Sequence, residues 1–195
     1  MDLSVIMCAH NEERYLPDQM DALLSQEWTG DWELIVVDNL SSDSTAAIIR
    51  AYASKDDRVQ LVHATERAGQ SYAMNVGGEA AKGELLAFCD ADDVVAPGWA
   101  AAIARGLEHH EVVTGPNELD LLNPPWLANS RGRSTEEPVG SFFGIFPTIR
   151  GANWGIRRAV WQRIGGIRED YSAGQDAELS LRCYLSGIEI VGIPE

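Results

Sequence analysis

The sequence has few cysteines, no long apolar run and no basic leader, and each shortage excludes a class of protein. Its 195 residues contain three cysteines, Cys8, Cys89 and Cys183, without the spacing of metal ligands, so we expect buried free thiols in a reducing cytoplasm. No apolar stretch approaches the roughly 18 residues that a membrane span requires. No basic segment precedes the first apolar run, so we expect no signal peptide. The prediction is a cytoplasmic protein without a transmembrane segment, either free or peripheral to the inner face of the membrane.

Basic side chains are also scarce, since 15 Lys and Arg face 30 Asp and Glu and give a net charge of −15. Such a surface repels the phosphates of nucleic acid, which we exclude as a partner. It would equally repel a nucleotide unless a positive group lies between them, and a bound divalent cation would serve. A well-solvated acidic surface is the simpler explanation of the same charge.

Apolar runs alternate with amphipathic segments along the first 115 residues. The alternation predicts an α/β fold with a Rossmann-like, mainly parallel sheet flanked by helices. The strands are expected at Leu3–Cys8, Leu34–Asp38, Val59–His63, Leu85–Asp90 and Val112–Gly115. The helices between them are expected at Glu12–Gln26 with Asn11 as its cap, Asp43–Ala53, Gln70–Ala81 and Pro97–His109. Ligands of such sheets bind beyond the carboxyl ends of the strands.

The pattern changes after Gly115. Residues 116–150 are predicted to be loop, and we expect 123–148 to be mobile until a ligand orders them. Helical periodicity returns at Arg157–Ile164 and again from Gln175 to Ser186, and Ile188–Ile193 is predicted to be a final strand.

Three carboxylates crowd the end of a predicted buried strand, in Asp90-Ala91-Asp92-Asp93. Like charges packed together destabilise the fold unless they are compensated, and Mg²⁺ prefers oxygen ligands of this kind. The segment is therefore either a divalent-cation site or a solvated acidic turn before the next helix.

Three further segments follow predicted strand ends or begin helices. Asp38 ends a strand and leads through Asn39 into a turn and a helix. Gly69 and Ser71 open a helix whose free N–H groups suit a phosphate or a ribose. Asp176 begins the late helix, either as a catalytic base or as an acid favoured by the helix dipole. Each segment also fits an ordinary strand–turn–helix junction.

Together these segments resemble family 2 of the inverting glycosyltransferases, which have the GT-A fold. The resemblance is carried in order by Ser4–Glu13, Val37–Asp43, Gly69–Gly77, Asp90–Asp93, Gly151–Trp154, Gly165–Glu169 and Gln175–Arg182. It implies one domain, with residues 1–115 as the nucleotide-sugar-binding half and residues 116–195 as the acceptor-side half.

The resemblance also implies a role for each matching residue. The donor, a nucleoside-diphosphate sugar, would be bound by Cys8, Ala9, Asn11, Glu12, Asp38, Asn39, Arg67, Gly69, Ser71, Asn75, Asp90 and Ala91. Asp92 and Asp93 would hold Mn²⁺ or Mg²⁺. Asp176 would be the general base that deprotonates the acceptor hydroxyl, supported by Glu178. Transfer would then invert the anomeric carbon.

The sequence departs from the family pattern at three positions: Asn39 replaces an Asp, Leu40 a Gly and Gln175 a Glu. A nucleotidyltransferase is an alternative, although Ala9-His10-Asn11-Glu12 stands where those enzymes carry a Gly-rich basic loop. A catalytically weak sugar-nucleotide-binding protein is another. The acceptor, whether glycan, lipid or small molecule, and self-association stay open.

Overall fold

A seven-stranded sheet forms the centre of the protein, which we describe from a computed structural model. The structure describes residues 1–131, 139–171 and 173–194, so that 132–138, within the segment expected to order with ligand, lie outside it. The strands are β1 (Leu3–Ala9), β2 (Trp32–Asp38), β3 (Val59–His63), β4 (Leu85–Asp90), β5 (Val112–Thr114), β8 (Asn153–Arg157) and β9 (Ile190–Gly192), in the order β3-β2-β1-β4-β8-β5-β9. All neighbours are parallel except β8, which runs antiparallel to β4 and β5. The predicted α/β fold with a mainly parallel sheet is confirmed.

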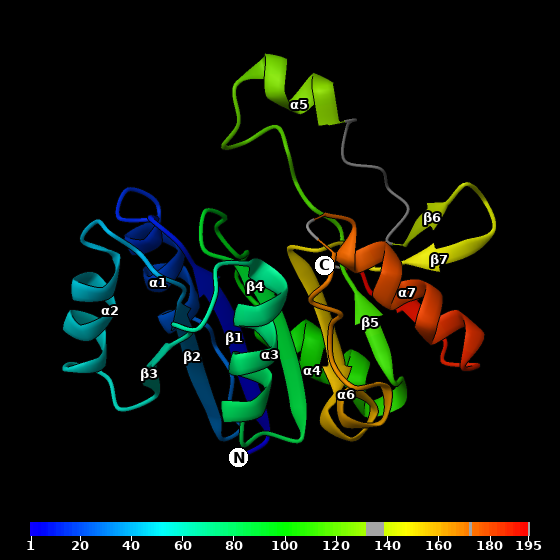
Figure 1. Cartoon of the computed structure of the whole chain (residues 1–195), viewed down its shortest axis with the longest axis horizontal. Coiled ribbons are helices and arrows are strands. Elements are labelled where there is room, and N and C mark those ends of the chain that lie inside the picture. The colour runs from blue at the N-terminus through cyan, green and yellow to red at the C-terminus, as the bar shows by residue number, and fades with distance from the viewer. Residues whose placement is uncertain (132–138, 172, 195) are drawn as a thin grey trace.

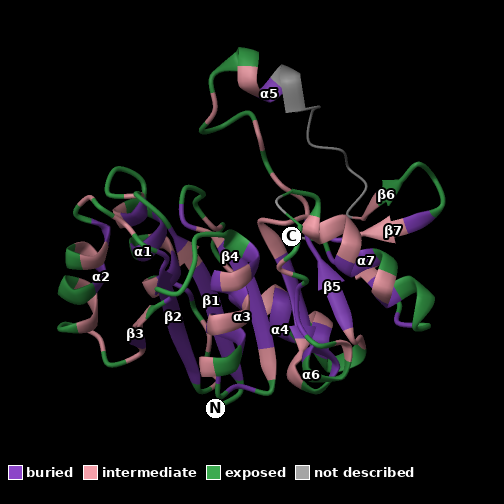
Figure 2. Ribbon diagram, viewed as in Figure 1, coloured by how far each residue is buried: buried purple, intermediate pink, exposed green. Residues whose placement is uncertain are grey.

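Helices cover both faces of the sheet (Figure 1). One core joins the sheet to α1 (Leu16–Leu24), α2 (Thr45–Ala53) and α4 (Trp99–His109), and the other joins it to α3 (Gln70–Ala80), α6 (Arg158–Ile164) and α7 (Gln175–Leu185). Along β1, Val5 and Met7 belong to the first core and Ile6 to the second. Figure 2 shows β1, β2 and β4 mostly buried and the helices exposed on their outer sides, as a sheet covered on both faces requires.

Close helix packing depends on two glycines. A Cβ on Gly77 of α3 would lie 2.5 Å from Ile6 Cγ2, and a Cβ on Gly155 of β8 would lie 2.6 Å from Ile103 Cγ2 of α4. Both distances are shorter than real Cβ contacts, so a side chain at either position would force the neighbouring isoleucine to shift. The absence of a side chain lets α3 and α4 lie directly on opposite faces of the sheet.

Strand β8 (Asn153–Arg157) was missed in the sequence, since no strand was predicted between the expected loop at 116–150 and the helix expected from Arg157. Its Trp154 is fully buried, pairs in register with Phe88 of β4 and stacks on that ring with centroids 4.2 Å apart. Trp161 of α6 adds a tilted ring 5.2 Å from Phe88. Long-range pairing and aromatic stacking define the strand, and a short local pattern does not reveal them.

The segment expected to be loop contains further structure. Helix α5 (Pro125–Arg131) and the antiparallel pair of β6 (Gly140–Phe142) and β7 (Phe146–Thr148) lie within it. Figure 1 shows α5 and this hairpin on the side where the central parallel strands end. In the described part of the chain, no helix is long and apolar enough to cross a membrane.

The first helix begins later than expected, and Asn11 does not cap it. Helix α1 starts at Leu16 after a turn in which the Leu16 amide donates to the Glu12 carbonyl, with Pro17 in its first turn. Asn11 instead has a left-handed backbone, φ 58°, and its Oδ1 accepts from the Ser42 amide at 2.8 Å. Its side chain therefore joins the turn after β1 to the turn after β2. Helix α4 likewise starts at Trp99 and not at Pro97, because Gly98 has φ 84°.

A buried carboxylate ties the opposite edge of the sheet. Glu33, 1% exposed, accepts from Ser4 Oγ at 2.7 Å, from the Lys82 amide at 2.7 Å and from Gln60 Nε2 at 2.6 Å. The Ser4 hydroxyl also accepts from the Gly83 amide at 2.8 Å. This network joins three strand beginnings to the turn before β4.

Replacement of Glu33 is therefore expected to destabilise the fold. Glu33→Ala leaves the Ser4, Gln60 and Lys82 donors without their acceptor, and we expect the free energy of unfolding to fall by roughly 2–4 kcal/mol. Urea denaturation measures it, with Glu27→Ala, an exposed glutamate, as the matched control expected to lie within about 0.5 kcal/mol of the parent. A loss below about 1 kcal/mol for Glu33→Ala would contradict the assigned role of the network.

Candidate functional site

The parallel register brings polar strand ends to one edge of the sheet. Ala9 pairs with Asp38, Asp38 pairs with His63, and Cys8 pairs with Asp90. Side chains predicted from separate segments therefore lie next to one another, as the rule for parallel sheets requires.

Asp90 is the most perturbed carboxyl group of the site. Burial, together with the charges of Asp93, Asp92 and Asp176, raises its pKa from 3.8 to about 7. A hydrogen bond from Gln70 Nε2 to Asp90 Oδ1, 3.0 Å long, acts in the opposite direction and favours the ionised form. The site therefore concentrates negative charge. Its carboxylates repel one another, and they would repel an anionic ligand unless a positive charge lies between them.

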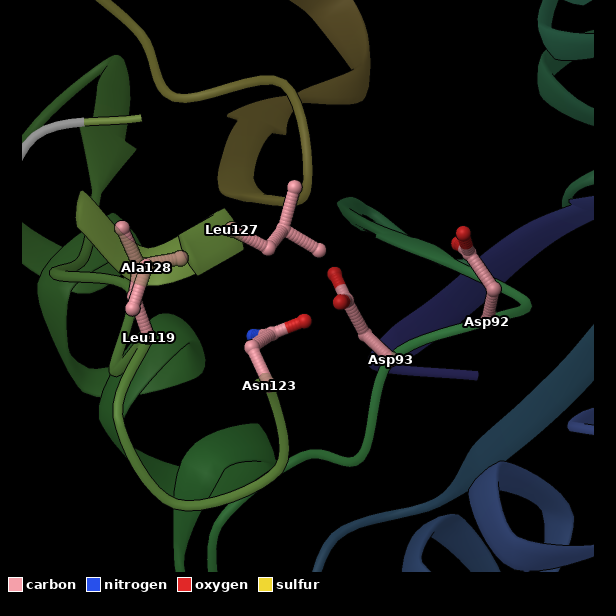
Figure 3. Close-up of a pocket in the computed structure, with 6 residues that line it drawn as sticks. All are labelled: Asp92, Asp93, Leu119, Asn123, Leu127 and Ala128. Carbon is pink, nitrogen blue, oxygen red and sulfur yellow. The ribbon is translucent and has the colours of Figure 1, made fainter. Parts of the chain in front are cut away.

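Two pockets flank this acidic edge. The larger, about 410 Å³, is lined by Asp90 and Asp176 together with Gln70, Met74, Asn117, Ile149, Gly151, Ala152, Trp154, Ile167, Ala173, Gly174 and Gln175. The smaller, about 130 Å³, is lined by Asp92 and Asp93 with Leu119, Asn123, Leu127 and Ala128 (Figure 3). In Figure 3, Asp93 points toward Asn123 and Leu127, and Asp92 points away from them.

The acidic turn is held from behind by a residue that the sequence did not single out. Gln19 of α1 is fully buried, its Nε2 donates to the Asp90 carbonyl at 2.8 Å, and its Oε1 accepts from the Val95 amide at 2.9 Å. The sequence does carry a signal for this role, since Gln19 is a polar residue on the inward, otherwise apolar face of an amphipathic helix. Gln19 fixes both ends of the turn that carries Asp92 and Asp93.

The described residues only partly assemble a metal site. Among them, no group of three His, Cys, Asp or Glu side chains is arranged to hold a metal ion. Mg²⁺, however, is commonly bound by one or two carboxylates together with substrate phosphates and water. The pKa of Glu12 is raised by burial and by the charges of Asp92 and Asp43, so negative potential also converges on Asp92 from this side. The residues present fit a divalent cation that is shared with a diphosphate.

Asp38 is buried at the end of β2. Its side chain is 8% exposed, Oδ2 lies 3.2 Å from His63 Nδ1, and Oδ1 is buried with no hydrogen-bond partner. Buried acceptors normally have a donor. The orphaned oxygen is therefore ready to accept a hydrogen bond from a ligand.

Asn39 lies beneath the predicted nucleotide loop and holds it. Its Nδ2 donates to the carbonyls of Ala64 and Arg67, both at 2.8 Å, and its Oδ1 accepts from the Gly69 amide at 2.8 Å. An ionised aspartate has no donor for the two carbonyls. The departure from the family pattern at this position thus has a structural reason.

Asn75 and Arg67 are engaged with the segment after α6. Asn75 Nδ2 donates to the Ile167 carbonyl at 2.8 Å and to Glu169 at 2.7 Å, and its Oδ1 accepts from the Ile167 amide at 2.9 Å. Arg67 pairs with Glu169 and lies over the Tyr72 ring. Both residues clamp the loop at 165–169 to α3.

Asp176 and Glu178 lie on different sides of α7. A Cβ on Gly151 would lie 3.6 Å from Asp176 Oδ2, which places this carboxylate against the turn before β8, in the larger pocket. Glu178 instead pairs with Arg182 through two hydrogen bonds of 2.7 and 2.8 Å, and Arg182 donates to the carbonyls of Ile164 and Gly166. The structure brings Asp176 to the pocket and gives Glu178 a place in the packing of the helix.

The remaining predicted residues lie at the ends of β1 and β4 and at the start of α3. Ala9, Ser71 and Ala91 are buried, and burial next to Asp90 raises the pKa of the Cys8 thiol, so Cys8 is neutral. Gly69 has φ 143°, a backbone conformation that favours glycine, at the start of α3. The sequence missed Gln70 and Asn117 as pocket residues, since neither carries a charge or a distinctive spacing.

A mainly parallel sheet with acidic residues and a pocket at its carboxyl edge is the arrangement of nucleotide-binding α/β enzymes. The chain belongs to glycosyl transferase family 2, whose model matches residues 4–165. Among curated proteins it is 27% identical over 213 residues to "Probable glycosyltransferase YdaM" of Bacillus subtilis, covering 98% of this chain and 49% of that protein. It is 33% identical over 93 residues to "Glycosyltransferase GlyG" of Streptococcus pneumoniae, covering 48% and 31%. The chain thus spans half or less of the length of these relatives.

Solved glycosyltransferases share the fold. The mannosyltransferase PcManGT of Pyrobaculum calidifontis, solved with GDP-Man and Mn²⁺, has a TM-score of 0.75 and 22% identity over 99% of this chain and 56% of its own. TarS 1–349 of S. aureus, solved with UDP-GlcNAc, has a TM-score of 0.75 and 20% identity over 100% and 56%. The fold is therefore of the GT-A type, and the family is the one that the sequence resemblance indicated.

Because the pKa of Asp90 is raised, we expect the free energy of unfolding of the metal-free protein to depend on pH. Below about pH 4 the carboxyl is protonated in both the folded and the unfolded state. Between pH 4 and 7 the folded state retains a proton that the unfolded state releases, so the contribution of Asp90 to stability falls as pH rises and levels off above 7. The loss is at most about 4 kcal/mol.

Asp90→Asn should remove this slope and be more stable than the parent at pH 8. Denaturation in chelator between pH 4 and pH 8 measures it, with Asp57→Asn, an exposed aspartate away from the pockets, as control. Parallel pH profiles for the parent and Asp90→Asn would contradict the assigned environment of this carboxyl.

Proposed function

We propose that the chain transfers a sugar from a nucleoside-diphosphate sugar to an acceptor hydroxyl, with inversion and with a divalent cation. The observation that carries the proposal is that Asp90 and Asp176 line one pocket of about 410 Å³ at the carboxyl edge of the sheet. Family membership supports sugar transfer, and the two solved relatives provide UDP-GlcNAc and GDP-mannose as donors to test.

The donor is proposed to lie along the strand ends. Asp38 offers its unpartnered oxygen to an N–H group of the base. Asp90 is the candidate partner of the ribose hydroxyls. Asp92, with Asp93 beside it, would hold Mn²⁺ or Mg²⁺, which when bound supplies Lewis-acid stabilisation of the departing diphosphate.

The transfer step needs one proton acceptor. Asp176 faces the pocket next to Gly151, where an acceptor hydroxyl would enter. A single carboxylate that takes the proton on the side away from the leaving group gives one displacement, and one displacement inverts the anomeric carbon. Asn39, Asn75 and Glu178 are proposed to hold the loops around the pocket and not to contact the reacting atoms.

Several features of the chain stay predictions. They are the acceptor, which is a glycan, a lipid or a small molecule, the self-association of the chain and its cytoplasmic location. A sugar-nucleotide-binding protein without turnover is the competing proposal, favoured because no group of three possible metal ligands occurs in the described part of the chain.

Replacement of Asp176 tests the proposed base. Asp176→Asn keeps the shape and removes the basicity, so we expect the release of nucleoside diphosphate from UDP-GlcNAc or GDP-mannose with Mn²⁺ to fall by roughly 10²–10⁴-fold. Calorimetric binding of UDP and GDP should be unchanged within about twofold, because Asp38 and Asp92 are intact.

Asp170→Asn is the matched control, since Asp170 is exposed, precedes the same helix and pairs with Arg168 outside the pocket. It should release nucleoside diphosphate at the parent rate. Unchanged release by Asp176→Asn would exclude this residue as the base. Binding of both nucleotides without any release by the parent would favour the binding protein.

A further inference from the structure

Two glutamines in the lining of the larger pocket hydrogen-bond to each other, and one of them also hydrogen-bonds to Asp90. Gln70 is the first residue of α3 and Gln175 is the first residue of α7, 105 positions later. Gln175 Nε2 donates to Gln70 Oε1 at 2.9 Å, and Gln70 Nε2 donates to Asp90 Oδ1 at 3.0 Å. One chain of hydrogen bonds therefore runs from the end of β4 to the start of α7.

The direction of these bonds requires an amide at position 175. The amide nitrogen of Gln70 donates to Asp90, so the amide oxygen of Gln70 is left toward α7. That oxygen needs a donor, which Gln175 supplies and an ionised glutamate does not. A glutamate, which the family pattern has here, would also add negative charge beside Asp90 and Asp176. The replacement of Glu by Gln at 175 is thus matched to the glutamine at 70.

The bridge lies at the end of α7 that carries Asp176. Ser180 Oγ accepts from the Ile149 amide at 3.1 Å, and Arg182 donates to the carbonyls of Ile164 and Gly166, so these contacts hold the helix from its second turn onward. The first turn follows Gly174, whose φ of 75° marks a sharp change in chain direction. The Gln175 side chain ties this turn to the nucleotide side of the pocket.

We propose that Gln70 and Gln175 are positioning residues that fix Asp176 relative to Asp90, an inference that rests on the proposed function. Gln70 has two contacts, since it orients the Asp90 carboxylate and also accepts the hydrogen bond from Gln175 of α7. Gln175 acts on α7 alone. The two residues are thereby expected to affect different kinetic constants.

The kinetic test compares Gln175→Leu, Gln70→Leu and the double variant, with Gln162→Leu, an exposed glutamine on α6, as control. The measured quantity is nucleoside diphosphate release from UDP-GlcNAc or GDP-mannose with Mn²⁺. Gln175→Leu should lower kcat by roughly 3–10-fold with KM unchanged within about twofold, the range of one hydrogen bond. Gln70→Leu should lower kcat at least as much and raise KM for the donor. The double variant should have the same kcat and KM as Gln70→Leu, because Gln70→Leu alone already removes the hydrogen bond between the two glutamines.

A second measurement does not depend on turnover. Hydrogen exchange of peptides that cover the first turn of α7 should quicken in Gln70→Leu, although that substitution is in α3, and should match the parent in Gln162→Leu. Parent-like exchange in Gln70→Leu would overturn the proposal, as would a parent-like kcat for Gln175→Leu or a double variant whose loss is the product of the single losses. If Asp176→Asn retains full release while exchange quickens, the base assignment fails and the bridge stands.

Discussion

Repulsion among carboxylates at the carboxyl edge of the sheet is the constraint around which this protein is built. Asp90 is partly buried within reach of the charges of Asp93, Asp92 and Asp176, and partial burial and these charges together raise its pKa to about 7. Asp92 and Asp93 follow Asp90 in the turn after β4, and α7 brings Asp176 to the same pocket, so the repulsion arises from the local sequence and from the packing of α7. A ligand that brings positive charge to this edge is stabilised by the same electrostatic energy that disfavours the empty site.

Amide side chains around the acidic edge hydrogen-bond to the backbone of its turns and loops and fix their positions. Gln19 fixes the turn after β4 from behind, Asn39 holds the loop before α3, and Asn75 holds the loop before α7. Amides suit this work because each donates and accepts without adding charge to a chain that already carries −15. Asn39 and Asn75, which the resemblance assigns to the nucleotide, thus hydrogen-bond to the backbone around the acidic edge.

Local patterns in the sequence were sufficient for the parallel half of the fold. Continuous apolar runs predicted β1, β2 and β4, and the residues that follow them, Asp38 and Asp90–Asp93, lie at one edge as expected. Strand β8 could not be found this way, because its identity depends on pairing between β4 and β5 and on the stacking of Trp154 against Phe88. The start of α1 was also missed, because the Asn11 side chain accepts a hydrogen bond from the turn after β2 and does not cap the helix.

Of the residues that line the larger pocket, the sequence singled out the charged ones and missed most of the neutral polar ones. Asp90 and Asp176 carry charges at element ends, where sequence patterns are informative. Gln70 and Gln175 are significant only because two helix starts 105 residues apart face each other across a pocket. For Glu178, helical geometry alone separates it from Asp176, and its bidentate pairing with Arg182 is visible only in the structure.

The central claim is that the acidic edge binds a nucleoside diphosphate through a divalent cation. Calorimetric titration of UDP and GDP into the protein, with Mn²⁺ and with excess chelator, tests it most directly. We predict that Mn²⁺ tightens the dissociation constant of at least one nucleotide by roughly tenfold or more, and that Asp92→Ala abolishes this difference while Asp57→Ala retains it. Equal affinity in Mn²⁺ and in chelator, for both nucleotides, would contradict the account.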